Sequence, residues 1–275
     1  MNRHVVKSQI CSDFIFPGRS FMRFRPCIDL HNGKVKQIVG STLRDSGEAE
    51  TNFVADFDSS YYAELYKKFG LAGGHVIMLG SGNEEAALLA LDTYPGGLQV
   101  GGGLDDVNGF RYLDAGASHL IFTSYVVADG VLHFDRIKKL NDIYGKNNIV
   151  LDLSCRKKND GKYYVVSNRW QTFTDVELNA ERLDELADYC DEFLIHAVDV
   201  EGKQCGIDDE LLEILSKHDK ISISYAGGIK SIEDIEKIRR TGHEKIDFTV
   251  GSALDIFGGS LEFEKIAELY GRNDK

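Results

Sequence analysis

Two aspartates stand where a carboxylate can act as an acid or a base. Asp29 ends the run PCID, and Asp152 ends the run IVLD. Removing a carboxylate from water costs free energy unless a partner or a function compensates for it. For either residue alone, an aspartate that begins a turn is the simpler interpretation. Both together favour a facing pair in which one group takes a proton and the other gives one.

Glycine-rich segments indicate a second kind of chemistry, the binding of anions. Glycine allows a backbone to approach a phosphate closely, and the N-terminus of a following helix offers free N–H groups and a partial positive charge. One glycine pair would be weak evidence, because glycine is also a common turn residue. Two such segments predict two phosphate sites and an elongated substrate with a phosphate at each end. The residues concerned are Gly102, Gly103, Thr123 and Ser124 for one site, and Gly227, Gly228, Gly251 and Ser252 for the other.

These residues need a scaffold that brings distant segments together. Apolar runs rich in β-branched residues alternate with stretches whose apolar residues recur every three or four positions, which predicts alternating strands and helices. The predicted strands cover 22–29, 74–79, 98–101, 119–124, 148–154, 192–198, 221–226 and 246–252. The predicted helices cover 59–70, 83–94, 106–116, 134–145, 179–190, 208–218, 231–242 and 263–271.

Eight strand–helix units in one chain predict a closed α/β barrel of the (β/α)₈ (TIM barrel) type. The strands are short and apolar on both faces, which is typical of a parallel sheet covered by helices. In such barrels the active site lies at the carboxyl ends of the strands, and the loops after strands 7 and 8 commonly bind phosphate. A doubly wound open sheet is the alternative, which the number of units and the positions of the glycines disfavour.

The sequence also repeats itself. Asp29 and Asp152 lie 123 positions apart, Gly103 and Gly228 lie 125 apart, and Ser124 and Ser252 lie 128 apart. Three pairs at nearly one offset predict two (β/α)₄ halves related by approximate two-fold symmetry. Strands 1 and 5 would then present their aspartates across the same barrel mouth.

The composition disfavours several classes of protein. Lys and Arg number 32 against 44 Asp and Glu, which gives a net charge of −12. So acidic a chain is a poor binder of nucleic acid or of an anionic membrane surface. No apolar run approaches the ~20 residues of a membrane span. The cysteines number five, and none forms a C-x-x-C pair, so we expect a reducing compartment and no zinc site.

The N-terminal segment differs from the rest of the chain. Its first 23 residues hold four basic residues and one acidic residue, and they contain no hydrophobic signal core. We interpret residues 1–21 as a flexible extension that is dispensable for activity, and residues 22–275 as a single barrel domain. The predicted location is the cytoplasm, with a plastid as the alternative because the extension faintly resembles a transit peptide.

Longer motifs resemble a known family. RPCIDLHNGKVKQIVGSTL, YPGGLQVGGGL, IVLDLSCRKK, RWQTFTDV, EFLIHAVDVEGKQCGID and DFTVGSALDIFGG occur in order along the chain. Together they resemble the eukaryotic-type phosphoribosylformimino-aminoimidazole carboxamide ribotide isomerases of histidine biosynthesis, over about residues 22–270. The resemblance implies a (β/α)₈ barrel, usually monomeric, that performs an Amadori rearrangement without metal or cofactor. The substrate of that family carries a phosphoribosyl group at each end.

The resemblance also implies roles for individual residues. Asp29 matches the general base at strand 1, and Asp152 matches the general acid at strand 5. Trp170 matches a loop tryptophan that stacks on the heterocycle of the substrate, although a tryptophan that only anchors the loop is as good an interpretation on sequence grounds.

Helper residues around the acid–base pair are less well matched. Asp199 and Glu201 are candidates to share the acid role, with surface charges as the alternative interpretation. Arg156 could attract an anionic end of the substrate, or it could be a solvated loop charge. His196 is predicted to be a core or orienting histidine.

Two competing functions stay open at the level of sequence. The cyclase subunit of imidazole glycerol phosphate synthase shares the fold, both strand-end aspartates and both phosphate sites. It places a lysine eight residues after the first aspartate, where this chain has Gln37. A non-catalytic barrel that binds phosphosugars is the other alternative. Turnover without ammonia distinguishes the isomerase from both.

Overall fold

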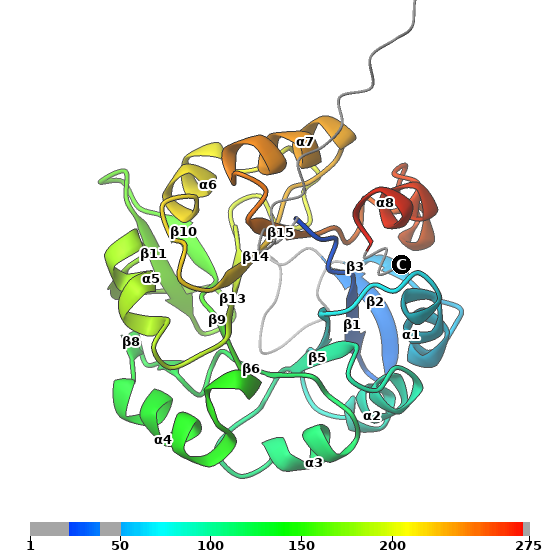
Figure 1. Ribbon diagram of the computed structural model, residues 1–275, viewed down its shortest axis with the longest axis horizontal. Helices are drawn as coiled ribbons and strands as arrows, with labels where there is room; N and C mark the ends of the chain where they lie inside the picture. Colours follow the sequence, from blue (N-terminus) through cyan, green and yellow to red (C-terminus); the bar gives the residue numbers. More distant parts are fainter. Residues whose placement is uncertain (1–21, 39–50, 272–275) are drawn as a thin grey trace, which may run out of the picture.

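A ring of eight parallel strands forms the centre of the protein in the computed structural model, which describes residues 22–38 and 51–271 (Figure 1). Each strand pairs with the next one along the chain, and the sheet curls until its ends meet. The strands are β1 (Cys27–His31), β4 (Gly74–Met78), β5 (Leu98–Gly101), β6 (Leu120–Phe122), β9 (Ile149–Asp152), β13 (Glu192–His196), β14 (Ser222–Ala226) and β15 (Ile246–Thr249).

The ring closes between the segment that leads into β1 and the last strand, β15. Phe24 forms a parallel bridge with Phe248. The Arg25 N–H donates to the carbonyl oxygen of Phe248 at 2.9 Å, and the Phe248 N–H donates to the carbonyl oxygen of Arg23 at 3.1 Å. Closure removes the unpaired edges that an open sheet would expose. The predicted barrel is therefore confirmed, and the open sheet is wrong.

Helices form an outer ring around the strands (Figure 1). Several begin at residues whose side chains accept hydrogen bonds from N–H groups of the first turn, as N-caps do; these are Asp58, Asn179, Asp208 and Ser231. The helices are α1 (Ser59–Lys68), α2 (Glu84–Thr93), α3 (Gly109–Asp114), α4 (Phe134–Tyr144), α5 (Ala180–Leu186), α6 (Asp209–Leu215), α7 (Ile232–Thr241) and α8 (Phe263–Tyr270), with short 3₁₀ turns η2 (Lys146–Asn148) and η3 (Asp255–Phe257). All eight predicted helices are present.

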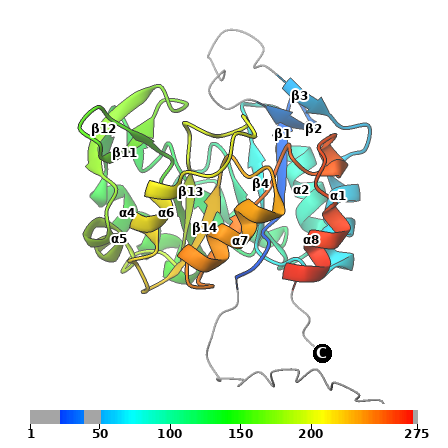
Figure 2. The same ribbon diagram turned by 90° about the horizontal axis from the view of Figure 1, so that it is seen from above.

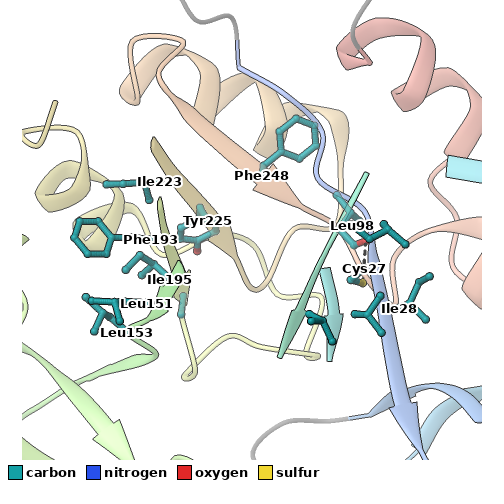
Figure 3. Packing of buried hydrophobic residues seen from close by; sticks show 14 of the residues in the cluster. Cys27, Ile28, Leu98, Leu151, Leu153, Phe193, Ile195, Ile223, Tyr225 and Phe248 are labelled. Carbon is teal, nitrogen blue, oxygen red and sulfur yellow. Dashed lines mark hydrogen bonds between the residues drawn. The ribbon is translucent and has the colours of Figure 1, made fainter. Parts of the chain in front are cut away.

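The core has two layers because side chains alternate along each strand. Phe193, Ile195, Ile223 and Tyr225 belong to the larger cluster, which fills the space between strands and helices (Figure 3). The interposed residues point into the ring and form a small inner cluster of Ile121, Val150, Leu194 and Ala226. Both faces of the strands are thus buried, which explains why the strands read as continuous apolar runs.

Short antiparallel strands lie in the loops after the barrel strands. The sequence did not predict them. β2 (Lys34–Ile38) and β3 (Thr51–Val54) extend the sheet at β1. β10 (Cys155–Lys157), β11 (Tyr163–Ser167) and β12 (Thr172–Glu177) form a separate sheet after β9, and β7 (Val127–Ala128) pairs with β8 (Val131–Leu132). Figure 2 shows β2–β3 and β11–β12 rising at the same end of the barrel. This end is the one where the chemistry was predicted.

Two further expectations concern the chain as a whole. The predicted extension, residues 1–21, lies outside the described residues. Within residues 22–38 and 51–271, no helix combines the length and the apolar character that crossing a membrane requires.

Candidate active site

A cavity of about 410 Å³ opens at the carboxyl ends of the barrel strands. Asp29 from β1, Asp152 from β9 and His196 from β13 line it together with Trp170 from the loop between β11 and β12. The two predicted aspartates, which are 123 positions apart in sequence, therefore face one common space. All eight residues of the two predicted phosphate sites line the same cavity.

The two rims of the cavity use the same backbone device. Gly102 follows β5 with a φ of +96°, and Gly227, its counterpart in the repeat, follows β14 with a φ of +124°. A Cβ atom at Gly102 would lie 2.1 Å from the carbonyl oxygen of Met78, and one at Gly227 would lie 2.9 Å from that of Ala197. Only glycine fits at either position. The two rims therefore repeat one glycine turn at symmetry-related places on the cavity wall, as two anion sites would.

Asp29 carries a perturbed carboxyl group. Burial and the nearby Glu201 carboxylate raise its pKa to about 7, and these effects outweigh the opposing charge of His196 and a hydrogen bond from Gln37. The Gln37 Nε2 donates to Asp29 Oδ2 at 3.1 Å. A pKa near neutrality allows a carboxylate to take a proton and return it at the pH of the cell. Asp29 is therefore equipped to act as a base.

Asp152 lies in a contrasting environment. Its Oδ1 accepts hydrogen bonds from the Ser154 N–H at 3.0 Å and from the Ser154 hydroxyl at 2.7 Å. Thr123 Oγ1 donates to Oδ2 at 3.2 Å. Burial opposes ionisation, but the His196 charge and the hydrogen bonds from His196 and Ser154 outweigh it, so the pKa of Asp152 lies below its ordinary value. The structure thus shifts the pKa values of the two aspartates in opposite directions, as paired acid–base groups require.

His196 connects Asp152 to the cavity. Its Nδ1 lies 3.4 Å from Asp152 Oδ1 and 3.3 Å from Ser154 Oγ. Burial alone would lower the pKa of His196, but Asp152, Glu201 and Asp29 together raise it to about 9. His196 is therefore an imidazolium at neutral pH. Sequence reasoning undervalued this residue, although it ends its strand just as Asp152 does, which was the available signal.

Comparison with known proteins adds an independent line of evidence. The sequence model of a family described as "Histidine biosynthesis protein" matches residues 23–261. The chain belongs to this family. The match spans the whole described ring, from the segment that closes the barrel to the loop before α8. The family that the motifs resemble is confirmed.

Individual relatives in the family share about half of their residues with this chain. A chloroplastic protein of Medicago truncatula is 54% identical over 252 residues, which cover 89% of this chain and 80% of the relative. A Neurospora crassa protein is 50% identical over 241 residues (86% and 93%), and a Saccharomyces cerevisiae protein is 49% identical over 246 residues (87% and 94%). Each of the three is named as a 1-(5-phosphoribosyl)-5-((5-phosphoribosylamino)methylideneamino) imidazole-4-carboxamide isomerase.

The structure separates the three predicted helpers of this family member. Glu201 lines the cavity, and its Oε2 is buried without a hydrogen-bond partner among the described residues. Burial raises the pKa of Glu201. Asp199 and Arg156 instead pair with each other at 2.8 Å, and neither lines the cavity. A helper role for Asp199 or Arg156 is therefore not supported, because their charges neutralise each other beside β10.

Trp170 has a strained backbone conformation, and its ring lies beside that of His196. The two rings lie 5.7 Å apart at an angle of 40°. Asn168, Arg169 and Trp170 have successive φ values of +50°, +51° and +67°. A left-handed conformation costs a residue other than glycine about 1–2 kcal/mol, and such strain often accompanies function. The indole lines the cavity as expected, while its stacking on a substrate stays a prediction.

A metal centre has no support from the arrangement of side chains. Across the described ranges, no three or more His, Cys, Asp or Glu side chains are grouped so that they could hold a metal ion.

Proposed function

We propose that this chain catalyses the isomerisation for which its relatives are named, an Amadori rearrangement of a phosphoribosylamine to the corresponding aminoketose. The observation that carries the proposal is the convergence of Asp29 and Asp152 on one cavity that has a glycine-rich turn on each of its two rims. An aldose–ketose rearrangement needs a proton donor, a proton acceptor and a grip on the substrate. The cavity offers all three.

The acid half of the proposed reaction lies at the end of β9. Protonation of the ribose ring oxygen on the side of Asp152 lets the bond between that oxygen and C1 break, and its electron pair stays on the oxygen. The lone pair of the attached nitrogen then forms a C=N bond to C1. The product of this step is an open-chain protonated imine.

The base half lies at the end of β1. Asp29 takes the proton from C2, the electrons of that C–H bond form the C1=C2 bond of an enol, and the π electrons of the C=N bond return to nitrogen. Return of a proton to C1 and loss of the enol hydroxyl proton give the ketone at C2, so no net proton is consumed. A base with a pKa of about 7 suits this exchange, because it is half ionised near neutral pH.

The rims of the cavity would hold the two phosphates of the substrate. The chain as a whole carries a net charge of −12, so its overall field repels a bisphosphate. Backbone N–H groups beside Gly102, Gly103, Gly227 and Gly228 can overcome this repulsion locally. A small bisphosphorylated molecule is therefore the proposed partner, rather than nucleic acid or a membrane.

The test is a turnover assay of the purified chain with the bisphosphorylated substrate of the relatives, in the absence of ammonia. We expect conversion to the aminoketose. Turnover that requires ammonia and a glutaminase partner would instead indicate the cyclase subunit, and binding without turnover would indicate a phosphosugar-binding barrel. Gln37 favours the isomerase over the cyclase, because it places a neutral amide, not a cationic lysine, against Asp29.

For the assembly and the compartment we propose a monomer in the cytoplasm. One chain contributes both aspartates and both rims, so the site needs no second copy. The Medicago truncatula relative is named as chloroplastic, which makes a plastid the alternative. Light scattering of the purified chain tests the first point, and microscopy of the full-length chain fused at its C-terminus to a fluorescent protein tests the second.

A further inference from the structure

We infer that His196 is the group that delivers the proton to the ribose ring oxygen, and that Asp152 is the positioning residue that holds and charges it. This inference rests on the proposed isomerase function and deepens it, because it assigns the acid step to a side chain that the two-aspartate scheme leaves out. It starts from the placement of the two nitrogens of the imidazole ring.

The two ring nitrogens have different surroundings. Nδ1 faces Asp152 Oδ1 at 3.4 Å and Ser154 Oγ at 3.3 Å. Nε2 makes no hydrogen bond to any group in residues 22–38 or 51–271, and it is not among the buried side-chain atoms that lack a partner. Since His196 lines the cavity, its second N–H is open to whatever binds there.

Asp152 is poorly placed to give a proton itself. Its two oxygens already accept from the Ser154 N–H, the Ser154 hydroxyl and the Thr123 hydroxyl, and Oδ1 also faces His196. A carboxylate that receives several hydrogen bonds holds its ionised form. Asp152 therefore resembles the orienting carboxylate of other acid–base pairs, in which it fixes an imidazole and stabilises its charge.

The groups around His196 strengthen this assignment. Asp29 on β1, Asp152 on β9 and Glu201 after β13 surround it with carboxyl groups, each of which favours the imidazolium. The other neighbouring histidine is His75 on β4, with ring centres 6.2 Å apart. Burial lowers the pKa of His75 to about 3, so it stays neutral and does not compete for the proton.

Protons are conserved over the proposed cycle. The imidazolium gives its Nε2 proton to the ring oxygen as the bond between that oxygen and C1 breaks, which leaves neutral His196. Asp29 takes the proton from C2 and later returns it to C1. The enol hydroxyl gives its proton back to Nε2 as the ketone forms. Both residues thus end in their starting states.

The experiment measures the pH dependence of kcat/KM for the wild type, His196→Asn, Asp152→Asn and the control His119→Gln. His119 pairs with Asp191 outside the cavity, so its variant should match the wild type. We expect a bell for the wild type, with an acidic limb near 7 from Asp29 and an alkaline limb near 9 from His196. His196→Asn should lose about 10²- to 10⁴-fold in rate together with the alkaline limb.

The Asp152→Asn variant distinguishes His196 from Asp152 as the proton donor. With His196 as donor, loss of Asp152 leaves residual activity whose alkaline limb moves from about 9 toward the ordinary histidine value of 6.5. With Asp152 as donor, this variant loses the limb altogether, whereas His196→Asn keeps it and stays within about tenfold of the wild type. That second pattern would overturn the inference.

A kinetic isotope effect tests whether His196→Asn slows the acid step or only disturbs the structure of the site. With deuterium at C2 of the ribose, slow ring opening in His196→Asn should reduce the kinetic isotope effect toward one. An undiminished effect contradicts the inference. Absence of turnover in the wild type would refute the proposed function itself, so the two failures are distinguishable.

Discussion

The two ends of the barrel both bury charged side chains, and they use them in opposite ways. At the amino ends of the strands, Arg25 bonds Glu192 at 3.1 Å and Asp247 at 2.7 Å. Gln99 and Ser224 donate to the Glu192 carboxylate as well. Each of these polar groups has partners, so the cluster is closed and complete.

The carboxyl ends of the strands present an incomplete cluster. Asp29, Asp152 and Glu201 are three carboxyl groups around one imidazolium, and one oxygen of Glu201 has no partner in the described part of the chain. The pKa values of the groups in such a cluster differ from one another and from their ordinary values. One scaffold therefore uses fully paired charges to stabilise its fold and incompletely paired charges to transfer protons.

The strongest way to break this contrast is to remove the base. Asp29→Asn should reduce kcat by about 10³-fold or more, because the amide cannot accept the C2 proton. The variant should bind substrate with little change, since the glycine rims are intact. Single-turnover kinetics and equilibrium binding measure the two effects, and activity within tenfold of the wild type would refute the role of Asp29.

At the amino ends of the strands, removal of a charged side chain should lower stability and leave catalysis unchanged. Arg25→Met leaves buried Glu192 without its cation and leaves Asp247 with Arg23 alone, which should lower the free energy of unfolding by about 3–5 kcal/mol. Urea denaturation measures this loss. The control is Lys237→Met, which breaks an exposed ion pair with Asp209 and should cost less than about 1 kcal/mol. Equal losses for both variants would contradict the contrast.

At the carboxyl ends of the strands, the buried carboxyl group of Asp29 should make the stability of the protein depend on pH. The folded state raises the pKa of Asp29 from 3.8 to about 7. The stability that Asp29 contributes is therefore complete below about pH 4 and is lost as the pH rises through 7. Asp29→Asn cannot ionise, so it should be more stable than the wild type by about 4 kcal/mol at pH 8. At pH 4 the two should melt alike, and a constant difference would refute the linkage.

Glycines at the two ends give the smallest and sharpest test. A Cβ atom at Gly73 would collide with the Arg25 guanidinium, whereas at Gly103 it would meet open space. Both positions have φ near +75°, so alanine adds about 1–2 kcal/mol of strain at each. Gly73→Ala should lower the melting temperature by much more than this strain alone would. Gly103→Ala should instead raise KM about tenfold, and more for a bisphosphate than for a monophosphate.

Much of the fold could be predicted because its signals are local. The alternation of strands and helices and the repeat at about 125 residues each depend on patterns within short windows. The antiparallel strands β10–β12 gave no such signal, because they are short and their buried and exposed positions do not alternate regularly. They are held by pairing with one another rather than by their own periodicity.

The site was predictable only in part for the same reason. Asp199 and Glu201 stand two positions apart in sequence, and nothing local distinguishes them. Asp199 accepts from the Lys157 N–H on β10, a strand that was not foreseen. A tight turn after β13, in which the Glu201 N–H donates to the carbonyl oxygen of Val198, directs Glu201 to the cavity instead. His196 was undervalued because its importance comes from distant carboxylates.

The closure of the ring has a consequence for how the protein is made. Arg25 and Asp247 are separated by 222 residues, yet they bond directly. At about 5–20 residues per second, a ribosome needs about 10–45 s to synthesise the interval between them. Throughout that time the nascent Arg25 lacks its partner, and the first strand has no last strand to pair with. The final step of folding therefore waits for the end of translation, and chaperones that shield exposed strands would act in that window.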